Sequence, residues 1–168
     1  FPYTTLFRSG GRDPLRVICD SSLRIPLDSN IVQTARSVPT LIAACITDSK
    51  KKHQLEELGC RGIEVPQKNA HTDLGVLFKR LGEEFSIDSV LIEGGAELAW
   101  SALSEGLVNK VQAYIAPKLF GGTGAKSPVG GAGVAEPSGA FRVDHSNIER
   151  FGDDIMIEGR VRYVHGDC

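Results

Sequence analysis

The chain has 168 residues, 41% of them apolar, and a formal net charge of −2. That length and composition suit one globular domain with a hydrophobic core, and the charge excludes the strongly basic surface of a nucleic-acid coat or membrane-surface protein. No apolar run is long enough to cross a bilayer, and no signal-peptide pattern opens the chain. We therefore expect neither nucleic acid nor a membrane as a partner.

The first nine residues, FPYTTLFRS, match codon by codon the translation of a common short-read sequencing adapter. We interpret residues 1–9 as adapter rather than native protein and leave them out of the fold argument. If the reading frame begins in adapter, residues 10–168 are the C-terminal part of one domain whose beginning lies upstream. The sequence shows no repeat and no second domain.

The first half of the chain alternates apolar runs with helical patterns. Buried strands are predicted at residues 15–19 and 40–46, and a short strand at 62–65. A helix capped by residues 47–49 should run to Leu58 and end at Gly59. An amphipathic helix should begin after Thr72 or Asp73, because Leu74, Leu77, Phe78 and Leu81 share one face.

The second half begins with a third predicted strand at residues 87–92, and a helix follows over 95–105. Residues 110–116 alternate as a strand does, and the glycine-rich stretch 121–139 reads as a long functional or mobile loop. Residues 141–150 and 155–164 form a predicted antiparallel hairpin. The order predicts an α/β fold: a mainly parallel sheet with helices on both faces and antiparallel strands at one edge.

The four cysteines (Cys19, Cys45, Cys60 and Cys168) have no metal-binding spacing, and the four histidines are scattered. Cys19 and Cys45 lie in apolar runs, which is typical of buried reduced thiols and favours a cytoplasmic protein. We therefore predict no metal site.

The most informative stretch joins the third predicted strand to the helix after it. Glu93 closes the apolar run, and Gly94 and Gly95 follow directly. A turn without side chains at a helix N-terminus lets backbone N–H groups approach an anion such as a diphosphate. A plain tight turn is the alternative, since two glycines are a poor fingerprint and the full G-x-G-x-x-G pattern of a Rossmann fold is absent.

Several segments in this order resemble the reductase domain of the bacterial riboflavin-biosynthesis deaminase–reductase, which has a dihydrofolate-reductase-like fold. The resemblance runs from about Pro14 to about Arg162. The matching segments are PLRVICDSSLRIP (14–26), VLIEGG (90–95), EGLVNK (105–110), YIAPKLFGG (114–122), PVGG (128–131) and the final hairpin.

The resemblance implies NADPH-dependent reduction of 5-amino-6-(5-phosphoribosylamino)uracil to the ribitylamino compound. It implies that Glu93 contacts the substrate and that Ser21 lies at the adenosine side of the cofactor. It also implies that the diphosphate is held by Gly94, Gly95, Ala96, Glu97 and Leu98. Family members usually associate through this domain, so a homodimer or higher homo-oligomer is expected for the full-length protein.

The chain departs from the family pattern in two ways. Glu97 stands where the family often has threonine, and a carboxylate there would lie close to a bound phosphate unless it points elsewhere. The lysine-containing strand, the Ser-Leu-Asp-Gly segment and the Asp-Asp-Pro loop of the family are absent, as is the deaminase's zinc signature (His-x-Glu with Pro-Cys-x-x-Cys). The sequence therefore predicts a fragment that is inactive alone.

Two other functions stay open: a stand-alone reductase of the same fold acting on a related pyrimidine or pterin, and a non-catalytic nucleotide-binding module. Three side chains have alternative readings. Arg24 could pair with the 2′-phosphate of NADPH or be a solvated charge. Lys118 could reach a phosphate, although a surface lysine is the default. Trp100 fits core packing better than base stacking.

Overall fold

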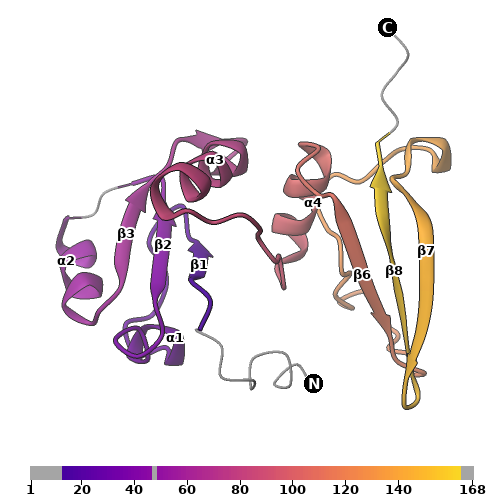
Figure 1. The fold of residues 1–168 in the computed structure, drawn as a ribbon, viewed down its shortest axis with the longest axis horizontal. Coiled ribbons are helices and arrows are strands. Elements are labelled where there is room, and N and C mark those ends of the chain that lie inside the picture. The colour runs from indigo at the N-terminus through magenta and orange to yellow at the C-terminus, as the bar shows by residue number, and fades with distance from the viewer. Residues whose placement is uncertain (1–12, 47–48, 164–168) are drawn as a thin grey trace, which may run out of the picture. The chain divides into compact units, whose positions relative to one another are not determined.

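A computed structural model describes residues 13–46 and 49–163, which fall into two compact units dividing between Asp88 and Ser89 (Figure 1). The interpretation of residues 1–9 as adapter, the capping role of residues 47–48, and Cys168 all lie outside the described residues. None of the described helices is both long and apolar enough to cross a membrane.

The first unit is built on a three-stranded sheet of order β1-β2-β3, and its strands are parallel, as predicted. The strands are β1 (Arg16–Cys19), β2 (Thr40–Ala44) and β3 (Arg61–Glu64). Every residue of the central strand β2 is buried, which is expected of a parallel strand covered on both faces. The strand β1 is only half-buried, because among the described residues it pairs with β2 on one side and lies at the edge of the sheet.

Three helices complete the core of this unit: α1 (Asn30–Gln33), α2 (Ser49–Glu57) and α3 (Leu74–Phe85). Ile42 of β2 packs in one cluster with Val32 of α1 and Leu55 of α2. The predicted face of α3 is buried at Leu74, Leu77 and Leu81. Asp73 caps α3 by accepting a hydrogen bond from the Val76 amide at 3.0 Å, so Asp73 rather than Thr72 is the cap. Between β3 and α3 lies a short hairpin, β4 (Gln67–Lys68) and β5 (His71–Thr72), that the sequence reading missed.

The predicted strand at 87–92 is not formed, and residues 86–95 have no regular secondary structure. α3 ends at Ser86, which adopts a left-handed conformation, and the chain continues in an extended segment whose Leu91 is 69% exposed. A strand needs a neighbour to pair its N–H and C=O groups, and none of the three sheets among the described residues includes this segment. The apolar pattern was therefore not sufficient to predict a strand.

The second unit contains α4 (Ala96–Ser104), β6 (Lys110–Ile115), the short 3₁₀ helix η2 (Pro137–Gly139), β7 (Arg142–Phe151) and β8 (Asp154–Arg162). The predicted hairpin is confirmed, with β7 and β8 antiparallel around Gly152 and Asp153. The antiparallel strands of this unit lie in the order β6-β8-β7 (Figure 1). The predicted α/β fold with a parallel sheet and C-terminal antiparallel strands is thus confirmed.

Two local features shape this second sheet. The register of β7 against β8 shifts between Asp144 and Asn147, which marks a β-bulge. Opposite the bulge, a Cβ at Gly159 would lie 2.8 Å from the carbonyl oxygen of Asp144, so the close backbone approach requires glycine at this position. The residue that permits the bulge is therefore on the partner strand.

A row of aromatic rings packs within the second unit. The Phe141 ring lies 5.9 Å from that of Trp100 on α4 and 5.6 Å from that of Tyr163, centroid to centroid. The Tyr163 hydroxyl donates a hydrogen bond to the Val108 carbonyl at 2.8 Å. Trp100 is thus a packing residue, as its helical position predicted.

Candidate functional site at the start of α4

The Glu93-Gly94-Gly95 segment leads into α4 through an exposed turn. A Cβ built at Gly94 would meet no atom within 4 Å, so the space beside this backbone is open. Gly95 is the N-cap of α4 and has a φ of +88°, a conformation that side-chain-bearing residues rarely adopt. The open space beside Gly94 fits the predicted close approach of a ligand to the backbone. The positive φ of Gly95 favours glycine at that position whether or not a ligand binds.

The first turn of α4 fits an anion by its backbone chemistry. The first N–H groups of any helix lack intrahelical partners, and Gly95 has no side chain that could cap them. The helix dipole adds partial positive charge at the same place. A diphosphate could therefore be held by the amides of Ala96, Glu97 and Leu98. The side chain of Leu98 is half-buried and packs beside Gly95, so its contribution to such a site is its amide.

A distant loop, residues 128–131, lies against this first turn. The Gly130 amide donates a hydrogen bond to the Ala96 carbonyl at 3.0 Å, and the Gly131 amide donates one to Oε1 of Glu97, also at 3.0 Å. From the sequence, Glu97 was expected near the phosphate and the PVGG segment in a long loop. The contact between Glu97 and this loop was not predicted. The adjacent glycines at 130 and 131 were the available signal, since they permit this close backbone approach.

Glu93 and Ser21 lie in different units. Glu93 is exposed at the end of the extended segment of the second unit, with Gly94 and Gly95 directly after it. Ser21 lies in the first unit, in the turn after β1, where its carbonyl accepts a hydrogen bond from the Cys45 amide at 3.0 Å. The other six predicted site residues, 93–98, are neighbours along one short stretch of the second unit, and Ser21 is a residue of the first unit.

Arg24, the candidate for the 2′-phosphate, has a partner within its own turn. Its Nε lies 3.7 Å from Oδ1 of Asp20, while Oδ2 of the same carboxylate accepts a hydrogen bond from the Ile25 amide at 2.7 Å. The Asp20 side chain is largely buried, and the arginine is exposed. A phosphate would therefore have to compete with the Asp20 carboxylate for the Arg24 guanidinium.

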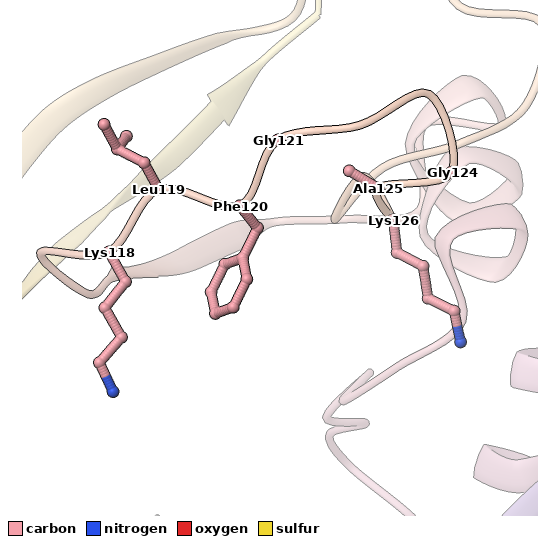
Figure 2. Close-up of a pocket in the computed structure, with 7 residues that line it drawn as sticks. All are labelled: Lys118, Leu119, Phe120, Gly121, Gly124, Ala125 and Lys126. Carbon is pink, nitrogen blue, oxygen red and sulfur yellow. The ribbon is translucent and has the colours of Figure 1, made fainter.

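An open pocket lies in the loop after β6, lined by Lys118, Leu119, Phe120, Gly121, Gly124, Ala125 and Lys126. Figure 2 shows the side chains of Lys118, Phe120 and Lys126 extending from the loop toward the same side. Phe120 is 83% exposed, so the pocket offers an apolar ring between two ammonium groups. The sequence reading considered Lys118 alone and did not anticipate Lys126 beside it.

The described cysteines and potential metal ligands do not form a reactive site. Burial, and to a smaller extent the neighbouring Cys45, raises the pKa of the Cys19 thiol to about 11. Cys19 is therefore a protonated thiol at neutral pH rather than a nucleophile. Within residues 13–46 and 49–163, no group of three His, Cys, Asp or Glu side chains could hold a metal ion.

Comparisons of this chain with known proteins point to one family. A model described as the RibD C-terminal domain matches residues 2–157. The chain is 43% identical to riboflavin biosynthesis protein RibD of Actinobacillus pleuropneumoniae, over 88% of this chain and 39% of that protein. It is 32% identical to the 2,5-diamino-6-ribosylamino-4(3H)-pyrimidinone 5′-phosphate reductase of Methanothermobacter thermautotrophicus, over 90% of this chain and 68% of that protein.

Solved structures support the same fold. The chain matches Acinetobacter baumannii RibD with a TM-score of 0.72 and 26% identity, over 89% of this chain and 38% of that one. The match to the riboflavin biosynthesis reductase of Saccharomyces has a TM-score of 0.69 over 95% of this chain, at 20% identity, and concerns the fold alone. The chain thus spans well under half the length of the RibD proteins that it resembles. Because the family model matches most of the chain, this protein belongs to the RibD C-terminal domain family, the reductase domains of riboflavin biosynthesis.

Proposed function

We propose that the chain is the reductase part of an enzyme that reduces 5-amino-6-(5-phosphoribosylamino)uracil to the ribitylamino compound with NADPH, within a longer bifunctional deaminase–reductase of the bacterial cytoplasm. Membership of the reductase family supports the reaction class. The assignment to this surface rests on the open glycine turn at the start of α4. There, no side chain of Gly94 or Gly95 blocks the approach of a ligand to the backbone amides.

The proposed roles follow from the chemistry of the groups. The turn at Gly94 and Gly95 and the amides of residues 96–98 hold the diphosphate of NADPH, which supplies a hydride when it is bound. Glu93, at the end of the extended segment, hydrogen-bonds and orients the substrate. Ser21 contacts the adenosine side of the cofactor. The protein's contribution is then position and exclusion of water rather than covalent chemistry.

The relatives favour two closely related substrates. The Methanothermobacter relative is named as a reductase of a 2,5-diamino-pyrimidinone phosphate, which carries an amino group where the uracil compound has an oxygen. The higher identity to a RibD protein supports the uracil compound, and a stand-alone reductase acting on a related pyrimidine or pterin is the alternative. Rates measured on both phosphorylated pyrimidines with the full-length protein would separate these two functions.

Gly94→Ala is a sharp test of the cofactor surface. Because a Cβ at Gly94 meets nothing within 4 Å, the substitution should leave the fold intact, but the new methyl group would stand where the diphosphate approaches. We expect NADPH affinity of the full-length protein to fall at least tenfold in a fluorescence titration. Gly139→Ala, where a Cβ would make only an ordinary contact with Val134, is the matched control and should bind normally. Unchanged binding by Gly94→Ala would contradict the assignment.

The third possibility is a nucleotide-binding module without catalysis. It predicts that the full-length protein binds NADPH yet never oxidises it in the presence of either pyrimidine. Sequencing the source DNA upstream of the Gly10 codon separates the readings further. A Ser-Leu-Asp-Gly segment preceded by His-x-Glu and Pro-Cys-x-x-Cys would support the bifunctional enzyme, whereas native codons for residues 1–9 after a start codon would favour the binding module.

A further inference from the structure

Glu97 is the one acidic side chain in the first turn of α4, where a negative charge would oppose a bound diphosphate. In this structure the carboxylate is directed at the 128–131 loop. Its Oε1 accepts a hydrogen bond from the Gly131 amide at 3.0 Å, across 34 residues of sequence. The charge is therefore partly satisfied by a backbone donor on a segment that is distant in the chain.

The same loop is anchored at a second point one residue away. The Gly130 amide donates to the Ala96 carbonyl at 3.0 Å, so two successive loop amides are bound by two successive residues of the helix. The approach is close enough that a Cβ at Gly130 would lie 2.9 Å from Oε1 of Glu97. The anchoring thus fixes the loop along the flank of the first turn.

Of the two anchors, only the Glu97 bond depends on a side chain. The Ala96 carbonyl is present whatever residue occupies position 96, whereas the acceptor for Gly131 exists because residue 97 is Glu. The second anchor therefore depends on the side chain at position 97.

We propose that Glu97 is a positioning residue for the cofactor: its carboxylate holds the 128–131 loop beside the start of α4 and thereby raises the affinity for a diphosphate-bearing nucleotide. The inference rests on the proposed function, since it assumes that the diphosphate binds at this turn. A loop that is already fixed loses less conformational freedom when ligand binds, and affinity increases accordingly. Glu97 is thus not a ligand of the phosphate through its side chain.

For the replacement of Glu97 by alanine, the inference predicts weaker NADPH binding, whereas charge repulsion alone predicts tighter binding. If Glu97 acted only through its charge, every neutral substitution would tighten NADPH binding. If it positions the loop, Glu97→Ala loses the acceptor and should weaken NADPH binding about fivefold to tenfold. Glu97→Gln keeps an oxygen acceptor without the charge and should bind within about twofold of the wild type. The loss of one hydrogen bond, about 1 kcal/mol, sets this scale.

The experiment compares full-length wild type, Glu97→Ala and Glu97→Gln by NADPH fluorescence titration and steady-state kinetics. Glu136→Ala, which removes an exposed carboxylate elsewhere in the same unit, is the charge control and should behave as wild type. For Glu97→Ala, we expect a higher KM for NADPH with kcat at saturating NADPH unchanged. Hydrogen exchange at the Gly131 amide, read by NMR without ligand, should be faster in Glu97→Ala than in Glu97→Gln.

Each outcome decides between the alternatives. Weaker binding in Glu97→Ala, rescued in Glu97→Gln, together with faster Gly131 exchange, supports positioning. Tighter binding in both variants means that charge repulsion alone operates, and equal binding in all proteins means that the loop contact is irrelevant to the cofactor; either result overturns the inference. If wild type itself binds no NADPH, the proposed function fails, and the exchange experiment still reports whether Glu97 holds the loop.

Discussion

Gly131 lies directly on the indole ring of Trp100, so close that a Cβ at this position would overlap the ring. Its φ of +72° also belongs to the left-handed region that favours glycine. Two separate physical constraints therefore act on one residue of the 128–131 loop. They act on the loop in addition to its hydrogen bond with Glu97.

Substitution of Gly131 should separate these constraints. We expect Gly131→Ala to lower the free energy of unfolding of the second unit by about 3 kcal/mol, from backbone strain plus overlap with the indole. Gly133→Ala is the matched control, because Gly133 has a φ of +66° but nothing within 4 Å of its Cβ position, and it should lose about 1 kcal/mol. Trp100 is the single tryptophan, so its fluorescence during urea unfolding reports this unit directly. Equal losses in the two variants would show that the ring contact is unimportant.

Replacement of Glu93 tests its assignment to the substrate. Glu93→Gln has the same shape and lies at an exposed position, so the fold should be unaffected. We expect the turnover of the full-length reductase to fall at least tenfold, about 1.4 kcal/mol of transition-state stabilisation, as a charged hydrogen bond to substrate is replaced by a neutral one. NADPH affinity should stay unchanged. Near-normal turnover would remove Glu93 from the site.

The cap of α3 gives a stability prediction for the first unit. Asp73→Ala removes the acceptor of the Val76 amide and should lower the free energy of unfolding by about 1 kcal/mol. Asp73→Asn retains an oxygen acceptor and should lose much less. Thermal unfolding followed by circular dichroism measures both variants. The assignment of the cap would be wrong if alanine and asparagine were equivalent.

The partly buried thiol of Cys19 predicts a pH dependence. Its pKa is raised from 9.0 to about 11, so the folded state favours the protonated thiol. The resulting stabilisation is complete below pH 9 and is lost as the pH rises from 9 to 11. At pH 8, alkylation of Cys19 by iodoacetamide should be about a hundredfold slower in the folded than in the unfolded protein, since the thiolate reacts. Mass spectrometry of the modified peptide follows the rate, and equal rates would mean that Cys19 is not protected.

The sequence predicted those elements whose signals are local. The apolar run of β2 and the alternation of β7 and β8 depend on neighbouring residues, and the structure confirms both. The start of α3 was also local, and of the two predicted cap residues the structure selects Asp73. The expectation for residues 87–92 was wrong because a strand also requires a partner strand, which is not a local property. The contact of Gly131 with Glu97 was missed for the same reason: 34 residues separate them, and periodicity carries no information at that distance.

The order of the second sheet has a consequence for biosynthesis. β8 is its middle strand, between β6 and β7, and it is the last of the three to be synthesised (Figure 1). While a ribosome still holds residues 154–162, β6 has no neighbour to pair with, and neither does β7. The turn at Gly152 and Asp153 then lets β7 and β8 join quickly, as hairpins form in about 1–10 μs, and β6 must close a longer segment of chain. This sheet therefore assembles only after β8 has left the ribosome, and β6, the first of its strands to be made, is the last to pair.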